Sequence, residues 1–446
     1  MAPKPLPLVI IACPPEHGHT LPLLPHATHL SQQGYEVHFI AGSALQDAIT
    51  QTGANFHPVQ TVITDEKLEQ IRAIPEGPDR LIHAMKVTFL DLIPESSKSL
   101  KAVLEKLREE QPGREIVIVQ EWVSMGTMPF VLGAPLPKGF DKLPPVISFT
   151  TVPLTVSSID TAPFGPGLPP DSSEEGRARN IAMYKGAADT LDLEINNYIN
   201  AVVANLGATE QITEPFFNNC LVGADLLAVP YNQTLEYPRS DLSPKVRFIG
   251  ATPRKPLNPS IPVPEWWGEV LEAKQGANPK KVIFVSQGTF ILDYRMLLIP
   301  SIEALAARDD CLVVGVLGQK GAKLDGVTVP ANTRIIDYLP YELILPHADV
   351  FVCNAGFGGF LTSLMHGVPM VLAGEGQDKA EVAMRGEYAG VGVNLRSATP
   401  SQEAIQKGID DVLTNKAYKT RCLEHQAENE KLNGLVQLEK LIQGFV

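Results

Sequence analysis

The stretch that decides the fold is VFVCNAGFGGFLTSLMHGVPMVL, residues 350–372. Val350–Cys353 is a short apolar run, typical of a parallel strand that is covered on both faces. A glycine-rich turn follows, a helix begins at about Gly358, and Gly367–Leu372 forms the next apolar run. Strand, helix and strand in this order predict a βαβ unit, and therefore a parallel sheet with helices packed on its faces.

The same alternation opens the chain. Leu8–Cys13 is a continuous apolar run, and Leu21–Gln33 has its apolar residues on one helical stripe that ends at Gly34, a favourable C′ residue. Tyr35–Ala41 supplies the next strand. The chain therefore predicts an α/β fold in which two Rossmann-like domains face each other across a cleft.

The domain boundary is expected at a proline-rich segment. Residues 253–264 contain five prolines and separate an N-terminal domain, residues 1–252, from a C-terminal domain, residues 265–425. Within the first domain, residues 128–170 are rich in proline and glycine, so we expect long loops over the cleft rather than regular structure. The segment 426–446 is expected to contain a final helix.

Composition limits the possible functions. The formal net charge of −13 over 446 residues argues against a nucleic-acid binder, which would need basic side chains against phosphates. The five cysteines are scattered without a CxxC pair, as in a reducing compartment. The apolar run 8–12 is too short for a signal peptide, and no run approaches ~18 apolar residues, so we expect a cytoplasmic protein without a membrane span.

Two candidate catalytic residues follow strands of the first domain. His19 follows the first strand, where a neutral imidazole can take a proton from an attacking hydroxyl; the alternative is a histidine that only caps a helix or bonds a loop carbonyl. A metal site with the nearby His26 and His29 is disfavoured, because no cysteine or carboxylate completes a ligand set. Glu121 follows another strand and would hold the imidazole tautomer, unless it is a solvated loop charge.

A third candidate site lies in the second domain. The glycine-rich turn 354–359 follows a buried strand and opens a helix, so its backbone N–H groups are suited to a diphosphate. It does not match GxGxxG, which disfavours an NAD oxidoreductase. Asp378 is suited to accept hydrogen bonds from sugar hydroxyls, although a helix N-cap is its alternative role.

Together these motifs resemble the family-1 glycosyltransferases of the GT-B fold, which transfer sugars from UDP-sugars to natural products. The resemblance covers essentially the whole chain. The matching segments are GHTLP at 18–22 for GHxxP, QGT at 287–289 for the phosphate loop, YLPY at 338–341 for the uracil-stacking WxPQ, residues 347–359 for HxAxxxFVTHGGxxS, GVPM at 367–370, and Asp378-Lys379 for the sugar-binding pair.

The resemblance implies an inverting, metal-independent transferase without a cofactor, in which His19 is the general base and Glu121 its partner. It also implies that the last helix crosses back to the first domain. The donor contacts that it implies are Gly18, Gln287, Gly288, Thr289, Tyr338, Leu339, Asn354, Gly356, Phe357, Gly358, Gly359, Asp378 and Lys379. For the acceptor pocket we expect Trp122, Phe130 and Phe164.

The departures from the family pattern bear on the donor. Asn354 replaces the diphosphate-binding histidine, Tyr341 replaces a glutamine, and Glu121 stands at the place of the usual aspartate. Thr362 replaces the ribose-binding glutamate, and Lys379 replaces a glutamine of the sugar-binding pair. These changes resemble the fungal and bacterial branches, and the missing glutamate leaves a dTDP-sugar open beside UDP-glucose.

We therefore expect an enzyme that moves glucose or a related hexose from a UDP-sugar to a small hydrophobic or phenolic acceptor. We expect a monomer or a weak dimer. The alternatives are a dTDP-sugar-dependent transferase, a nucleotide-sugar epimerase of the same architecture, and a nucleotide-sugar-binding protein without turnover.

Overall fold

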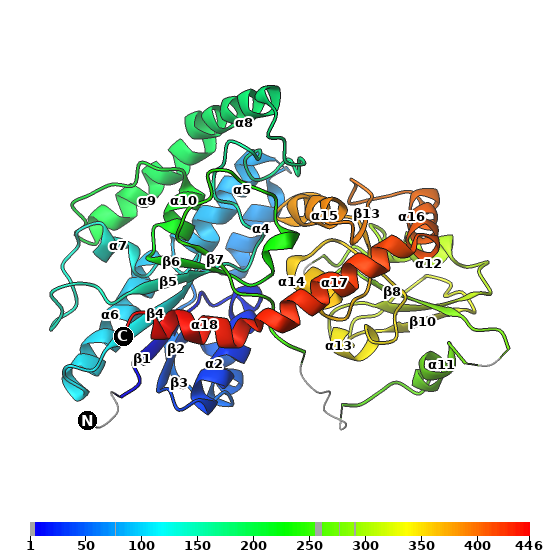
Figure 1. Cartoon of the computed structure of the whole chain (residues 1–446), viewed down its shortest axis with the longest axis horizontal. Coiled ribbons are helices and arrows are strands. Elements are labelled where there is room, and N and C mark those ends of the chain that lie inside the picture. The colour runs from blue at the N-terminus through cyan, green and yellow to red at the C-terminus, as the bar shows by residue number, and fades with distance from the viewer. Residues whose placement is uncertain (1–4, 76, 255–260, 276, 290) are drawn as a thin grey trace.

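The structure, a computed structural model, describes residues 5–75, 77–254, 261–275, 277–289 and 291–446. It contains two parallel sheets, each with helices on both faces (Figure 1). This arrangement confirms the expected α/β fold with two Rossmann-like domains. Of the predicted linker, residues 255–260 lie outside the described residues.

The N-terminal sheet has the strand order β3-β2-β1-β4-β5-β6-β7. The third strand in this order, β1, is buried on both faces: Val9 and Ile11 pack with α2 (Leu24–Gln32) and α18 (Gly434–Gln443), and Leu8 and Ile10 pack with α6 (Ile93–Glu110). Its strands are β1 (Leu8–Ala12), β2 (Val37–Gly42), β3 (Asn55–Val59), β4 (Ile116–Glu121), β5 (Val146–Phe149), β6 (Leu226–Val229) and β7 (Val246–Phe248).

The helices of this domain cover the sheet and extend over its carboxyl edge. They are α1 (His17–Thr20), α2 (Leu24–Gln32), α3 (Gln46–Thr50), α4 (Asp65–Ala73), α5 (Pro78–Met85), α6 (Ile93–Glu110), α7 (Met128–Val131), α8 (Glu174–Ala187), α9 (Leu193–Asn205) and α10 (Phe216–Val222). Three short 3₁₀ turns are η1 (Leu21–Leu23), η2 (Ser43–Leu45) and η5 (Gln233–Leu235), and two π-helical turns are η3 (Lys86–Leu90) and η4 (Ala188–Asp192).

The C-terminal sheet has the order β10-β9-β8-β11-β12-β13. Its strands are β8 (Lys281–Ser286), β9 (Cys311–Val316), β10 (Thr333–Ile336), β11 (Val350–Cys353), β12 (Met370–Leu372) and β13 (Gly392–Asn394). Its helices are α11 (Trp267–Glu272), α12 (Leu298–Ala304), α13 (Tyr341–Ile344), α14 (Phe357–Met365), α15 (Lys379–Tyr388), α16 (Gln402–Thr414) and α17 (Lys416–Leu432), and the chain ends with α18 (Gly434–Gln443).

One expectation for the first domain is wrong. Residues 128–170 were expected to form loops alone, but they contain α7 and the buried strand β5. The run Val-Ile-Ser-Phe is only four residues long and follows two prolines, so its apolar character is hidden by the turn-forming residues around it. The loops of this segment begin after β5, at the carboxyl edge of the sheet.

The end of the chain consists of two helices rather than one. The final helix expected within the segment 426–446 is interrupted at Asn433, which has the left-handed φ of 59° and ends α17 (Lys416–Leu432). α18 then lies beside α2 of the first domain (Figure 1), and its Leu438 and Ile442 are fully buried in the core that contains β1 and β2. No helix within the described ranges is both long and apolar enough to cross a bilayer.

The position of α18 gives a stability prediction. Because Leu438 is fully buried, we expect Leu438→Ala to lower the free energy of unfolding by ~2–5 kcal/mol. Leu423→Ala on α17 is the matched control, because Leu423 is 45% exposed. Urea unfolding followed by circular dichroism measures both changes, and equal losses in the two variants would contradict the assignment of α18 to the core of the first domain.

Candidate active site

The candidate catalytic pair lies where the strand order of the first sheet reverses. β1 and β4 are neighbours and pair Ala12 with Gln120, although β2 and β3 separate them in the chain. His19 is in α1, directly after β1, and Glu121 is the last residue of β4. Parallel α/β sheets bind ligands at such switch points, outside the carboxyl ends of the strands.

The predicted pairing of these two residues is confirmed. His19 Nδ1 lies 2.7 Å from Glu121 Oε1. Glu121 is fully buried, and its second oxygen accepts the Val123 backbone N–H at 3.0 Å. Thr151, just beyond β5, donates its hydroxyl to Glu121 Oε1 at 2.5 Å. The carboxylate is therefore held on both oxygens and is not a solvated loop charge.

The surroundings of His19 favour a basic imidazole. Burial by itself lowers the pKa of His19, but the charge of Glu121 and the hydrogen bond to it outweigh burial and raise the pKa above its usual value; Glu16 and Asp378 add to this rise. The Phe89 ring, from the π-turn η3, contacts the imidazole at a centroid distance of 5.1 Å. With Nδ1 held by Glu121, Nε2 is the nitrogen that can take a proton.

A second switch point lies in the C-terminal sheet. β8 and β11 pair Ser286 with Cys353, so the loop after β8 and the glycine-rich turn after β11 leave the same edge. In that turn Ala355 has a positive φ of 58°, and Asn354 Oδ1 accepts the Gly356 N–H at 3.3 Å. The Asn354 amide also donates to the Gln287 carbonyl, which joins the two loops. α14 begins at Phe357 and directs its N-terminus to this edge.

Asp378 connects the second site to the first. It precedes α15, and within the described part of the chain its side chain makes no capping hydrogen bond, so the N-cap alternative is not supported. Burial raises the pKa of the Asp378 carboxyl, against the opposing effect of the Lys379 ammonium. Its charge also acts on His19 of the other domain. Three residues further on, Glu381 of α15 accepts the backbone N–H groups of Gly165 and Gly167, so this end of the helix contacts the first domain.

Comparison with known proteins identifies the family. The chain is 40% identical over 440 residues to UDP-glucosyltransferase 1 of Beauveria bassiana (strain ARSEF 2860), covering 97% of this chain and 94% of that protein. The chain belongs to the family-1 glycosyltransferases. UDP-glucosyltransferase A1 of Starmerella bombicola is 33% identical, with 98% and 92% covered, and 4'-demethylrebeccamycin synthase of Lentzea aerocolonigenes is 31% identical, with 98% and 99% covered.

Other comparisons agree with this family and its fold. The profile of the Erythromycin biosynthesis protein CIII-like, C-terminal domain family matches residues 301–432. The glycotransferase of kitacinnamycin superposes with a TM-score of 0.72 at 17% identity, covering 99% of this chain and 100% of that one. Spinosyn rhamnosyltransferase SpnG complexed with thymidine diphosphate superposes at 0.63 and 16%, covering 98% and 100%. The GT-B fold and the expectation of a UDP-glycosyltransferase are confirmed.

Two of the expected donor contacts of this glycosyltransferase have side chains that face the protein interior. The Gln287 amide donates to the carbonyls of Ile291 and Asp293 and accepts the N–H groups of Leu297 and Leu298. These bonds of the Gln287 side chain hold the loop after β8 in shape, so a donor contact of this residue would have to come from its backbone. The Leu339 side chain is 2% exposed and belongs to the apolar core.

The loop after β8 is closely packed at Gly288, an expected donor contact. Gly318 approaches it so tightly that a Cβ at Gly318 would lie 2.1 Å from the Gly288 carbonyl oxygen. Both glycines have positive φ, so this contact between the loop after β8 and the loop after β9 favours glycine at both positions. Thr289 is exposed beside them, and its carbonyl accepts the Gln319 amide at 3.0 Å.

The other expected donor contacts differ in how their side chains are placed. Tyr338 is 43% exposed, and the Lys320 ammonium lies over its ring, 5.6 Å from the centroid. Thr362 donates its hydroxyl to the Gly358 carbonyl one turn earlier, and this bond occupies its only proton. Lys379 is buried and bonds the Gln377 side chain. Gly18 lies next to His19, and a Cβ there would meet nothing within 4 Å.

The expected acceptor residues do not all lie together. Trp122 stacks on Phe217 at 5.8 Å, and Phe164 packs on the same ring at 5.0 Å. Phe130, in α7, instead packs against the core between the sheet and α6, apart from Trp122 and Phe164. The ring that Trp122 and Phe164 share, Phe217, comes from α10, a helix that no motif marked. Thr151 was also not predicted, because it follows β5, the strand whose short apolar run is hidden by the prolines before it.

The pairing of His19 with Glu121 predicts a change in pKa. Glu121→Gln removes the charge that raises the His19 pKa and leaves the burial that lowers it. We therefore expect the pKa of His19 to fall below its usual value of ~6.5. NMR titration of the imidazole measures this shift, with His347 of the C-terminal domain as the internal control. An unchanged or higher His19 pKa would show that Glu121 does not control this imidazole.

Proposed function

We propose that this glycosyltransferase moves glucose from UDP-glucose to a hydroxyl of a small hydrophobic or phenolic acceptor, with inversion at the anomeric carbon. The observation that carries the proposal is the contact of 2.7 Å between His19 Nδ1 and the buried Glu121 carboxylate. Such a pair is suited to remove a proton from a hydroxyl at neutral pH.

In the proposed reaction, His19 Nε2 accepts the proton of the acceptor hydroxyl as its oxygen attacks the anomeric carbon. The new bond between carbon and oxygen forms on the face opposite the leaving diphosphate, and the bond from the anomeric carbon to the phosphate oxygen breaks. The imidazolium that forms is stabilised by Glu121, which is fixed by Val123 and Thr151. UDP leaves with the electron pair, and the proton passes from His19 to solvent.

The donor would be held by groups of the second domain. The backbone N–H groups of residues 356–359, with Asn354 and Thr289, would carry the diphosphate charge, because a helix N-terminus and a turn of free N–H groups favour an anion. Tyr338 would stack on the base, and Asp378 would accept hydrogen bonds from sugar hydroxyls. The proposal needs no metal ion and no cofactor.

The names of the relatives support glucose and UDP for this chain. Both fungal relatives are called UDP-glucosyltransferases, whereas spinosyn rhamnosyltransferase was solved with thymidine diphosphate. Transfer from a dTDP-sugar therefore stays the second candidate, because Thr362 offers the ribose only a short and already bonded hydroxyl. A nucleotide-sugar epimerase finds no support among these relatives.

The assigned base predicts a selective loss of rate. His19→Ala should slow transfer to an alcohol by ~10²–10⁴-fold, because general-base catalysis contributes about this factor. An acidic phenol should be affected less, since it ionises without help. Transfer and donor hydrolysis measured across a panel of alcohols and phenols test the activity and the variant together. His17→Ala, two residues away, is the matched control, and wild-type rates for His19→Ala with an alcohol would remove His19 from the mechanism.

The donor assignment predicts a shallow nucleotide preference. Thr362 stands where the family usually has a glutamate that binds the ribose, and a hydrogen bond to such a charged group is worth ~1.5–3 kcal/mol. Because this chain lacks that bond, we expect UDP-glucose to be favoured over dTDP-glucose by a modest factor only. Direct competition between the two donors measures this preference, and a strong preference for dTDP-glucose would contradict the donor assignment.

The assignment of Asp378 to the sugar predicts a second loss of rate. We expect Asp378→Ala to abolish most turnover by removing the sugar contact, and full turnover by this variant would contradict the sugar site.

A further inference from the structure

Helix α15 faces the N-terminal domain with three charged residues. Asp378 at its start, Glu381 and Arg385 are spaced by three and then four residues, which puts them on one helical face. Glu381 and Arg385 are 7% and 3% exposed. Charged side chains are almost never this buried unless they are paired, so their partners define what this face of the helix does.

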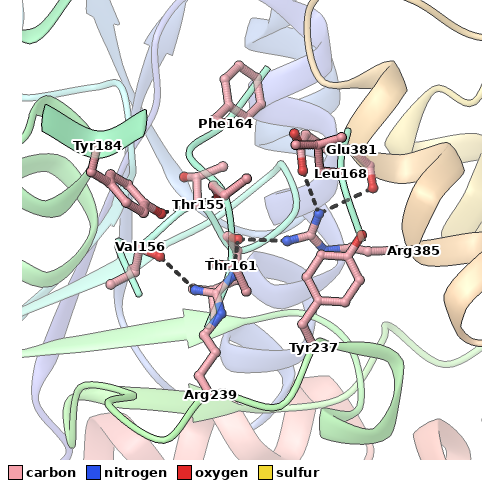
Figure 2. A pocket seen from close by; sticks show the side chains of 12 residues that line it. Thr155, Val156, Thr161, Phe164, Leu168, Tyr184, Tyr237, Arg239, Glu381 and Arg385 are labelled. Atoms are coloured by element: carbon pink, nitrogen blue, oxygen red, sulfur yellow. Dashed lines mark hydrogen bonds and ion pairs between the residues drawn. The ribbon is translucent and has the colours of Figure 1, made fainter. Parts of the chain in front are cut away.

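Arg385 finds its partners in the other domain. Its Nε and Nη2 each lie 3.0 Å from one oxygen of Glu236, a bidentate ion pair, and Nη2 also donates to the Leu154 carbonyl at 2.9 Å. The Tyr237 ring covers the guanidinium at 4.5 Å. Figure 2 shows Arg385 extending from its helix toward the segment that carries Thr155 and Val156. The guanidinium is thus buried in the domain to which it does not belong.

Leu154 belongs to the segment that supports the catalytic pair. Its N–H donates to the Tyr231 hydroxyl at 2.9 Å, and its carbonyl accepts both Arg385 and Arg239. Three residues earlier, Thr151 bonds the Glu121 carboxylate. Arg385 therefore fixes the chain that holds Thr151, and it does so from the domain proposed to bind the donor.

Glu381 makes a parallel connection to the acceptor side. Its Oε1 accepts the N–H groups of Gly165 and Gly167, each at 3.0 Å. Gly167 has φ +58°, and a Cβ there would lie 2.7 Å from the Ala380 carbonyl oxygen, so the loop contacts the helix backbone itself. Phe164 of this loop packs on Phe217. The loop with the acceptor-side aromatic residues is thus attached to α15.

A stabilising role alone does not explain this cluster. Burying ions costs several kcal/mol each, and replacing a buried pair by apolar residues is often neutral or stabilising. What two domains gain from such a cluster is one defined relative position, because interfaces within a chain otherwise permit domain motion. Each domain supplies one arginine and one glutamate, Arg239 with Glu236 and Arg385 with Glu381, and the pair of Arg385 with Glu236 joins the two sets across the interface.

We infer that Arg385 and Glu381 are positioning residues of the transfer reaction. They hold α15, with Asp378 at its start, against the first domain, and they fix the segments that carry Thr151 and Phe164. This inference rests on the proposed function, because it assigns the sugar contact to Asp378 and the base to His19.

Arg385→Met tests the inference in the full chain. We expect kcat for glucose transfer to fall by ~10²-fold, as for other small misplacements of reacting groups. The affinity for UDP alone, measured by calorimetry, should not change, because the groups proposed above for the diphosphate and the base, residues 354–359, Thr289 and Tyr338, all belong to the second domain. Arg396→Met is the matched control, since Arg396 pairs with Glu387 within that domain and is largely exposed. Arg385→Lys should not restore the rate, because an ammonium cannot form the bidentate pair.

A merely structural role would lower UDP affinity, folded fraction and kcat in parallel, and that result would overturn the inference, as would a wild-type kcat. Glu381→Ala is the second variant, because it leaves Arg385 paired with Glu236. Its kcat and UDP affinity can therefore be measured if Arg385→Met does not fold. It should also lower kcat with unchanged UDP affinity; loss of the fold in both variants would assign the cluster to stability instead. Absence of transfer by the wild-type chain would instead refute the proposed function.

Discussion

The burial of the Glu121 carboxylate is the constraint on which the catalytic side of this molecule depends. An ionised carboxylate without solvent is costly unless each oxygen has a partner, so the chain must supply three groups at fixed positions. They come from the turn after β1, the backbone after β4 and the residue beyond β5. Three adjacent strands of one sheet are therefore tied to a single charge, and the orientation of His19 follows from that arrangement.

The two domains use the same geometry for different tasks. Each sheet reverses its strand order next to its central strand, and each places polar groups at the carboxyl edge of that point. In the first domain these groups are side chains, suited to moving a proton. In the second they are mainly backbone N–H groups around residues 354–359, suited to a spread negative charge. The proposed reaction joins a neutral hydroxyl to a charged donor, so it uses both a sheet edge with side chains that take a proton and a sheet edge with N–H groups that bind an anion.

The sequence predicted the features that depend on local pattern. The central strands were found because parallel strands buried on both faces are continuous apolar runs, and His19 and Glu121 were found because they follow such runs. β5 was missed because four apolar residues beside prolines resemble a loop, and Thr151 was missed with it. Arg385 and Glu236 are 149 residues apart in the chain, so no local pattern marks them. The motif residue Gln287 faces inward, because a motif does not state which atoms of a residue it uses.

The left-handed break at Asn433 has a mechanical consequence. The chain passes between the domains twice, once through the segment that leaves Ala251 and once where α17 ends and α18 enters the first core. These two crossings touch, since the Ala251 N–H donates to Asn429 and its carbonyl accepts the Gly434 N–H. The two crossings are therefore fastened to each other at Ala251, so the first domain is connected to the second at one shared point. A change in the relative position of the domains would pivot about this point, and it would move α15 relative to the first domain.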